Sequence, residues 1–219
     1  MINAVNLTKR FKNFMAVNDV SLQVEKGQIF GLLGPNAAGK TTVIRMLCGI
    51  IECDEGKVRL NGKSVSKAKT DFGYVAQHFG QYEDLSVWEN LAFYASMYDI
   101  TDKSWLDTLL DRYELTQFKE QLAGTLSGGY KRRLALACAL AHEPEILFLD
   151  EPTAGIDPLT RKLLWDDFYR LSTEGKTLFV TTHYMEEAQR CHQLAFLSAG
   201  HKVAEGSPET IKQALNNAS

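Results

Sequence analysis

The sequence IFGLLGPNAAGKTT, Ile29 to Thr42, decides the fold of this chain. Its first part, Ile29 to Leu33, is apolar apart from one glycine and is typical of a strand buried on both faces of a parallel sheet. Gly34 to Thr41 has the spacing Gly, four residues, Gly-Lys-Thr, and an apolar helical pattern begins at Val43. A glycine-rich loop between a strand and a helix presents backbone N–H groups to phosphate. The sequence therefore predicts a nucleotide phosphate site.

Residues of this loop have separate predicted tasks. Lys40 is expected to reach the β- and γ-phosphates as a point charge, and Thr41 to offer its hydroxyl to Mg²⁺. The predicted nucleotide-binding residues of the loop are Gly34, Pro35, Asn36, Ala37, Ala38, Gly39, Lys40, Thr41 and Thr42. The loop alone fits an ATPase, a GTPase or a kinase.

A second buried strand supplies acidic side chains. ILFLD, Ile146 to Asp150, is nearly all apolar and ends on a carboxylate, with Glu151 next. Ligands bind at the carboxyl ends of strands in open α/β sheets. We therefore expect Asp150 to hold the Mg²⁺ shell and Glu151 to polarise an attacking water.

The remaining patterns place these segments in a larger fold. Ile2 to Leu7 and Val20 to Val24 alternate like strands of an antiparallel sheet, and Asn61-Gly62 is typical of a hairpin turn. Ser86 to about Phe118 is helical in pattern, and a further helix extends to about Ala141. Strands and helices then alternate to a tail helix, which favours a mostly parallel, helix-covered sheet.

The predicted fold is thus α/β. It has a P-loop NTPase core with a mostly parallel sheet, an antiparallel β subdomain and a helical subdomain. We expect one domain over residues 1–219, with a nucleotide-binding core of about 1–85 and 143–219 and a helical insert of about 86–142.

Composition limits the function. The chain has 219 residues, 45% hydrophobic, and a formal net charge of -3, which suits a soluble globular domain without a broad basic surface for nucleic acid. Its four cysteines form no CxxC pair and no zinc-like cluster, so we expect buried, reduced thiols. The longest apolar run, Leu134 to Ala141, is far shorter than the ~20 residues of a membrane span, and we expect no signal peptide. A role at a membrane would need a partner chain.

LSGGYKRR, Leu126 to Arg133, places two glycines in front of a basic helix. Glycine is a poor helix former unless something must approach the backbone closely. The basic residues Lys131 to Arg133 suggest a solvated helix face rather than a nucleic-acid patch.

Together, LSGGY, Gly34 to Thr42 and LFLDEP resemble the nucleotide-binding domain of ATP-binding cassette (ABC) transporters, over about residues 2 to 210. The resemblance implies that Phe11 stacks on adenine, that Gln77 contacts Mg²⁺ and the membrane partner, and that His183 lies near the γ-phosphate. It also implies that Asp157 belongs to the D-loop. The implied catalytic residues are Glu151, His183 and Gln77, and the implied metal ligands are Thr41, Gln77 and Asp150.

The resemblance further implies a head-to-tail dimer, with itself or a homologous ABC ATPase, that holds two ATPs. The signature facing the partner's ATP would be Leu126, Ser127, Gly128, Gly129 and Tyr130. Two residues depart from the family pattern. Ala37 replaces a glycine, which would cost about 1 kcal/mol if the loop needs a positive φ there; this cost is tolerable and bears on nucleotide affinity rather than on whether nucleotide binds. Tyr130 replaces the common glutamine, which we interpret as a subfamily mark.

The chain is most similar in pattern to ATPase subunits of bacterial exporters of drugs, lipids or polysaccharides. We therefore expect an ATP- and Mg²⁺-dependent ATPase on the cytoplasmic face of the inner membrane, bound to a separate permease through Phe79, Tyr82 and Leu85. The alternative is a soluble ABC-type ATPase without a membrane partner, acting in assembly, DNA maintenance or translation. The short gap between phosphate loop and signature, and the single cassette, disfavour the DNA and translation versions.

Overall fold

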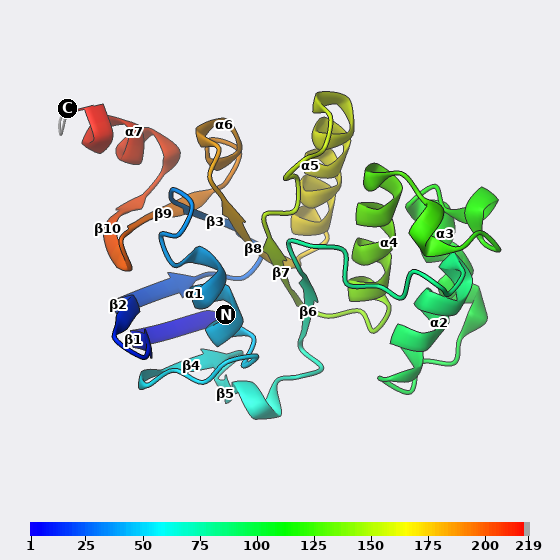
Figure 1. Cartoon of the computed structure of the whole chain (residues 1–219), viewed down its shortest axis with the longest axis horizontal. Helices are drawn as coiled ribbons and strands as arrows, with labels where there is room; N and C mark the ends of the chain where they lie inside the picture. The colour runs from blue at the N-terminus through cyan, green and yellow to red at the C-terminus, as the bar shows by residue number, and fades with distance from the viewer. Residues whose placement is uncertain (217–219) are drawn as a thin grey trace.

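The computed structural model describes residues 1–216, and these form two sheets (Figure 1). The antiparallel sheet has the order β2-β1-β4-β5, with bounds β1 (Ile2–Phe11), β2 (Phe14–Val24), β4 (Glu55–Leu60) and β5 (Lys63–Ser64). The second sheet has the order β10-β9-β3-β8-β7-β6, with bounds β3 (Ile29–Leu33), β6 (Phe72–Val75), β7 (Ile146–Asp150), β8 (Thr177–Thr182), β9 (Gln193–Ser198) and β10 (His201–Gly206). All its strands are parallel except β10, which confirms the predicted fold class.

Helices cover both faces of the parallel sheet. Their bounds are α1 (Lys40–Leu47), α2 (Val87–Ser96), α3 (Lys103–Arg112), α4 (Gly128–Leu140), α5 (Pro158–Thr173), α6 (Met185–Ala188) and α7 (Pro208–Asn216). Because side chains alternate along a strand, β7 contributes to two cores. Phe148 packs with α1 and the antiparallel sheet, whereas Leu147 and Leu149 pack with α2 to α5. Burial on both faces explains why the parallel strands are nearly all apolar.

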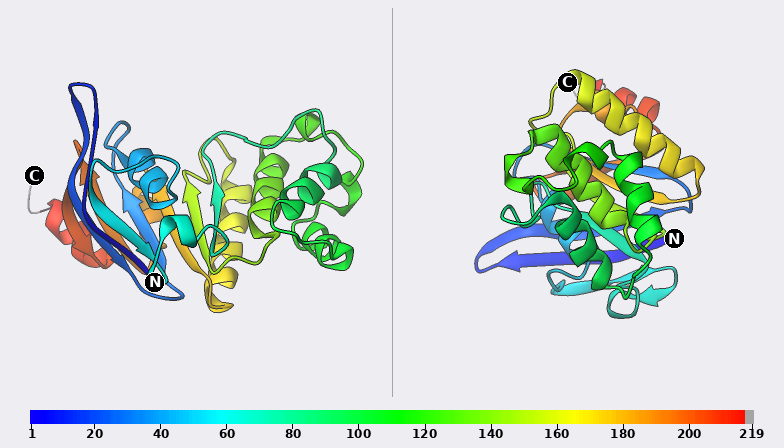
Figure 2. Two further views of the ribbon diagram at one scale, coloured as in Figure 1. Left: turned by 90° about the horizontal axis from the view of Figure 1, so that it is seen from below. Right: turned by 90° about the vertical axis from the view of Figure 1, so that its right-hand side faces the viewer.

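The chain between β6 and β7 is helical. The expected helical stretch after Ser86 is two helices, because Asp99 has a positive φ of 58° and Asp102 caps a new helix. Figure 2 shows α2, α3 and α4 grouped at one end of the molecule, away from the antiparallel sheet. Ser86 starts this group with a capping box formed with Glu89, a pattern worth about 1 kcal/mol.

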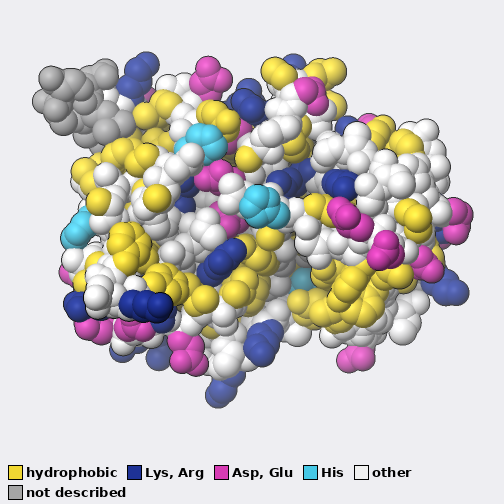
Figure 3. Space-filling model, in the orientation of Figure 1, with side chains coloured by type: hydrophobic (Ala, Val, Ile, Leu, Met, Phe, Trp, Pro, Cys, Tyr) yellow, Lys and Arg dark blue, Asp and Glu magenta, His cyan; other side chains and the backbone are white. Residues whose placement is uncertain are grey.

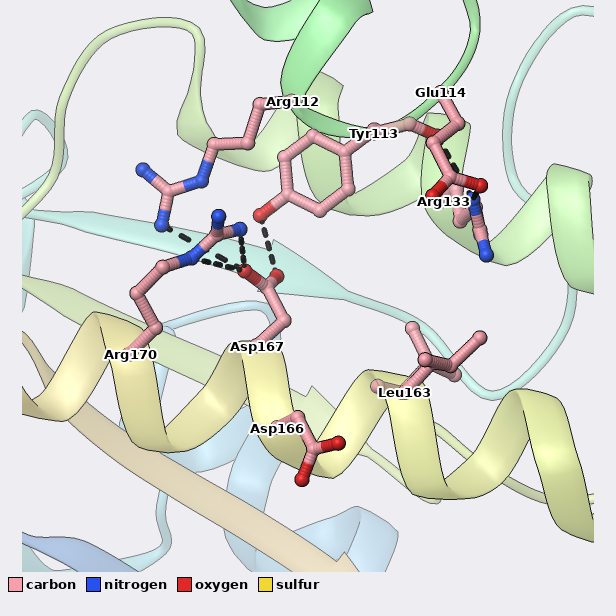
Figure 4. Close-up of a pocket in the computed structure, with 9 residues that line it drawn as sticks. Arg112, Tyr113, Glu114, Arg133, Leu163, Asp166, Asp167 and Arg170 are labelled. Carbon is pink, nitrogen blue, oxygen red and sulfur yellow. Dashed lines mark hydrogen bonds and ion pairs between the residues drawn. The ribbon is translucent and has the colours of Figure 1, made fainter.

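A polar cluster joins this helical group to α5. Asp167 accepts a hydrogen bond of 2.7 Å from the Tyr113 hydroxyl and pairs with Arg112 and Arg170 (Figure 4). Next to it, Arg133 of α4 pairs with Glu114 (Figure 4). Positive and negative groups balance in this hollow, so it ties elements together rather than presenting a charged site.

Several local predictions have clear outcomes. Asn61 and Gly62 have φ values of 52° and 77°, and the turn joins β4 to β5 as predicted. Strand β10 was not predicted, because its alternation of half-buried and exposed residues is weak in the sequence.

All four cysteines are free, and Cys53 is the one that is only partly buried. No helix within residues 1–216 combines the length and apolar character that crossing a bilayer requires.

Candidate nucleotide-binding site

The predicted site residues lie at the carboxyl edge of the parallel sheet. The phosphate loop follows β3, Asp150 ends β7, His183 follows β8, and Gln77 lies two residues after β6. Parallel strands deliver all these ends to one edge. The sheet order places β3, β8, β7 and β6 side by side, so segments far apart in the sequence meet there.

The phosphate loop has the strained backbone that its glycines suggest. Ala37 has a φ of 63° and Gly39 a φ of 103°, both in the left-handed region. A Cβ at Gly39 would collide with the backbone oxygen of Ala16, so that position requires glycine for space as well as for conformation. The predicted cost of alanine at position 37 depended on a positive φ there, and Ala37 does adopt a positive φ.

Lys40 begins α1 and lies 4% exposed below the loop. Its Nζ donates to the backbone oxygens of Gly34 at 2.8 Å and Pro35 at 3.0 Å. It also pairs with Glu151 Oε1 at 3.2 Å. The buried cation is thus held by two carbonyls of the loop and balanced by the carboxylate of Glu151.

Asp150 is a buried carboxylate that can accept a further ligand. Its Oδ1 accepts from Thr181 Oγ1 at 2.6 Å and from Thr41 Oγ1 at 3.3 Å. Within residues 1–216, its buried Oδ2 has no hydrogen-bond partner. Burial raises the pKa of Asp150, and the hydrogen bonds from Thr181 and Thr41 oppose this. A desolvated carboxylate oxygen without a donor is costly unless a cation binds it.

These donors fit Mg²⁺. The cation prefers oxygen ligands and binds through one or two carboxylates together with substrate phosphates. Thr41 and Asp150 supply a hydroxyl and a carboxylate in contact with each other. No cluster of three or more His, Cys, Asp or Glu side chains suited to a metal occurs among residues 1–216.

Glu151 is the point where the other predicted residues meet. Its Oε2 accepts from Gln77 Nε2 at 3.2 Å and lies 3.2 Å from His183 Nδ1. Its backbone N–H donates to Thr181 Oγ1 at 2.9 Å, and its φ is 45°. A non-glycine residue held at positive φ indicates that the surroundings fix its direction.

A pocket of about 350 Å³ adjoins this cluster and is open toward the β1–β2 hairpin. Its lining residues are Phe11, Phe14, Ala16, Asn36, Ala37, Gly39, Lys40, Thr41, Thr42, Gln77 and Glu151. Phe11 is 47% exposed, so a flat ring is available for a base. Phe14, its partner across the hairpin, was not predicted, and a second aromatic three residues after Phe11 is the signal that could have identified it.

The signature residues have different surroundings. Leu126 is buried in the core, and the Tyr130 ring packs on Phe118 at 4.4 Å between centroids. Ser127 is the N-cap of α4 but makes no capping bond with its side chain within the described residues. A Cβ at Gly128 would meet no atom within 4 Å among residues 1–216, and one at Gly129 would come 3.1 Å from Thr160.

Among residues 1–216, Gly128 therefore has no steric reason to be glycine. Its φ is not in the positive region either. Asp157 has a clear local role, because it caps α5 by accepting from the N–H groups of Leu159 and Thr160. Hydrogen bonds from Thr160 lower the pKa of Asp157.

The sequence analysis did not predict the burial of two charged residues. Glu187 of α6 is 2% exposed and accepts from Thr153 and, at 2.7 Å, from Thr182. It therefore joins the segment after Glu151 to the end of β8. Arg132 was predicted to lie on a solvated face, and this is wrong, because it is 8% exposed and turns toward the backbone of the Gln77 segment.

The predicted partner contacts do not line one groove. Phe79 packs beside α4 and shares a hollow with Gly128, whereas Tyr82 is 51% exposed and meets Phe93 edge-on. Leu85 is half-buried. A separate groove next to β6 has lining residues that include His78, Gln81, Tyr94, Met97, Tyr98 and His142.

The phosphate loop, the carboxylates on the neighbouring strand and the glycine-led helix of the insert define a P-loop ATPase of the cassette type. The ABC transporter family model matches residues 17–154. The chain belongs to the ABC transporter family and is one of its ATP-binding cassettes.

Related sequences and solved structures agree with this family assignment. The chain is 40% identical, over 97% of its length, to the probable multidrug ABC transporter ATP-binding protein YbhF of Escherichia coli, and it spans 38% of that relative's length. It is 41% identical, over 97% of its length, to the Nod factor export ATP-binding protein I of Burkholderia pseudomallei, of which it spans 73%. A dimeric bacterial ABC transporter cassette superposes with a TM-score of 0.88 at 26% identity, covering 95% of this chain and 99% of that one.

Proposed function

We propose that this chain is the ATP-hydrolysing subunit of an exporter, which pairs head to tail around two ATPs and drives a separate membrane subunit. The observation that carries the proposal is the meeting of Lys40, Gln77 and His183 at Glu151, beside the unpartnered oxygen of Asp150. The relatives named for multidrug transport and Nod factor export support the exporter assignment.

In this proposal each residue of the sheet edge has a task in hydrolysis. Lys40 exchanges its contact with Glu151 for the β- and γ-phosphates, which frees the Glu151 carboxylate to accept a hydrogen bond from the attacking water. Gln77 and His183, which contact the same oxygen of Glu151, orient that water and the γ-phosphate. Thr41, Gln77 and Asp150 would hold Mg²⁺, which when bound would supply positive charge against the charge that develops on the phosphates.

Pairing of two copies explains the open face of the signature. Ser127 Oγ and the N–H groups of Gly128 and Gly129 lie at the N-terminus of a 13-residue helix, where the helix dipole favours an anion. Because no atom of the described residues would obstruct a Cβ at Gly128, a γ-phosphate held by a second copy can approach it closely. A solved cassette with a similar fold is dimeric, which supports pairing of two copies.

The core and the helical insert have different proposed roles. We propose that about 1–85 and 143–219 form the nucleotide-binding core, described here as far as residue 216, and that 86–142 form the insert that presents the signature. The groove next to β6 lies between these parts and contains Gln81, Tyr94 and Met97. Figure 3 shows apolar side chains gathered over α2, where Phe93 and Met97 are exposed. We assign the permease contact to this groove and to Tyr82 beside it, rather than to Phe79.

The ATPase part of the proposal is tested by measuring phosphate release from Mg²⁺-ATP at increasing protein concentration. Specific activity should rise until dimers saturate and should be lost when EDTA removes Mg²⁺. An activity independent of protein concentration would contradict the paired site.

The membrane part needs its own experiment. Met97→Glu places a charge in the groove, and it should abolish co-purification with the permease while basal hydrolysis persists. Val203→Glu, at an equally exposed position on β10, is the matched control. If the unaltered chain hydrolyses ATP but is found with no membrane protein, the soluble ABC ATPase becomes the better assignment.

A further inference from the structure

Arg132 is a buried cation whose partners are backbone oxygens. It lies on the second turn of α4, four residues after Gly128. Its Nη1 donates to the oxygen of Ala76 at 2.7 Å, and its Nη2 donates to the oxygen of Gln77 at 2.9 Å. Burial lowers the pKa of Arg132, and the Asp150 carboxylate opposes this. A guanidinium remains charged in proteins at neutral pH.

The two hydrogen bonds of Arg132 fix both the position and the orientation of the segment that they bind. A guanidinium is planar and rigid, so two of its N–H groups bound to consecutive carbonyls fix the orientation of that peptide segment. A carboxylate partner would neutralise the charge better, and the chain uses none here among the hydrogen bonds of Arg132. The arrangement therefore favours positioning of the Gln77 segment over charge pairing.

A continuous set of contacts leads from Arg132 to the reacting centre. Gln77, whose backbone Arg132 holds, donates through its side chain to Glu151 Oε2 at 3.2 Å. In the other direction, Arg132 lines a hollow with Gly128 of the signature and with Gly155 and Ile156, which precede α5. The neighbouring Lys131 reinforces the attachment through its ion pair with Glu83 at 3.1 Å.

We propose that Arg132 is a positioning residue that couples the two ATP sites of the dimer: when the partner's ATP draws in the N-terminus of α4, Arg132 moves the Gln77 segment against Glu151 of its own site. The proposal rests on the proposed function, because it requires that Gly128 face the ATP of a second copy. It adds a route by which occupation of one site sets the geometry of the other.

The test compares Arg132→Gln and Arg132→Lys with a matched control, Arg133→Gln. Arg133 is the next residue of the same helix, but it binds Glu114 and the Tyr113 backbone, away from the site (Figure 4). Glutamine removes the charge and the two-pronged donor, whereas lysine keeps the charge and can hold one carbonyl.

Arg132→Gln should lower kcat about tenfold, because a displaced Gln77 segment disturbs the geometry of the reacting groups, and it should bring the Hill coefficient for ATP toward 1. The KM should stay within about twofold, because ground-state binding at Lys40 is untouched. Arg132→Lys should retain part of both properties, and Arg133→Gln should behave like the unaltered protein. Hydrogen exchange of residues 76–83 should accelerate only in the Arg132 variants.

Unaltered kcat and Hill coefficient in both Arg132 variants would overturn the proposal, as would equal losses in Arg133→Gln. If Arg132→Gln fails to fold, Arg132→Lys decides by the same measurements. If the unaltered protein itself hydrolyses no ATP, the proposed function fails, and the exchange measurement still shows whether Arg132 holds the segment.

Discussion

Ala37→Gly tests the strained phosphate loop. Ala37 is exposed and has a φ of 63°, so its methyl group contributes strain without compensating burial. An L-residue in the left-handed region costs about 1 to 2 kcal/mol, which glycine does not pay. Glycine in turn gives the unfolded chain more freedom, which destabilises the folded state by about 0.4 to 1 kcal/mol. The difference predicts that Ala37→Gly raises the free energy of unfolding by about 0 to 1.6 kcal/mol.

The same geometry predicts little change in ATP affinity. Ala37 belongs to a loop held between β3 and α1, so we expect its positive φ, and the cost of that φ, in the free and the ATP-bound protein alike, where the cost cancels. The sequence alone related this cost to nucleotide affinity, whereas we predict that it falls on folding. We expect the dissociation constant of Ala37→Gly to stay within about twofold of the original.

Urea unfolding without nucleotide and calorimetric titration with ATP measure the two quantities. Ala38→Gly is the matched control: Ala38 is buried and has no positive φ, so the change should destabilise by about 0.5 to 1 kcal/mol. Equal destabilisation by the two substitutions would refute the strain argument. A tenfold gain in affinity with unchanged stability would show that the loop changes conformation on binding.

Three further predictions concern the nucleotide. Lys40→Ala should weaken ATP binding at least about tenfold in calorimetry, because a charge-assisted contact is lost; unchanged binding would remove the phosphate-loop assignment. Phe11→Ala should cost about 1 kcal/mol of stacking in the same titration, whereas Phe11→Tyr should be nearly silent, and a large loss with tyrosine would argue against stacking. His183→Ala should lower kcat with little change in ATP affinity, since its contact with Glu151 belongs to the reacting centre; normal turnover with weak binding would make His183 structural.

The sequence was informative wherever the chemistry is local. The phosphate loop, its flanking strand and helix, and the strand ending at Asp150 are each contained in fewer than about twenty residues, so periodicity and glycine spacing identify them. The meeting of Gln77 and Glu151, which are 74 residues apart, depends on which strands are neighbours in the sheet. Only the resemblance to a family, not the residues themselves, connected them.

Buried charges and irregular segments were beyond local patterns. Arg132 lies in a run of three basic residues, which usually indicates a solvent-exposed helix face. Its burial depends instead on the distant segment against which α4 packs. Phe79 and Tyr82 look equivalent in the sequence, yet an irregular backbone points them to different surfaces, because no helix or strand periodicity constrains a loop.

The central claim is that the signature of one copy completes the ATP site of another. Glu151→Gln should slow hydrolysis while ATP still binds, so this variant should elute as a dimer with Mg²⁺-ATP and as a monomer with ADP. Adding Gly128→Asp tests the contact more cleanly than a change at Gly129, because a Cβ at Gly128 meets no atom of its own chain within 4 Å among residues 1–216. The new carboxylate would face the partner's γ-phosphate, and like charges repel strongly in such a contact.

The deciding measurement is size-exclusion chromatography of Glu151→Gln/Gly128→Asp with Mg²⁺-ATP, beside Glu151→Gln/Gly80→Asp, which adds the same charge at an exposed glycine outside the signature. We predict that the Gly128 variant elutes as a monomer and still binds ATP in calorimetry, while the Gly80 variant elutes as a dimer. A Gly128 variant that still dimerises with ATP would contradict the account, because Gly128 would then not face the nucleotide of a second copy.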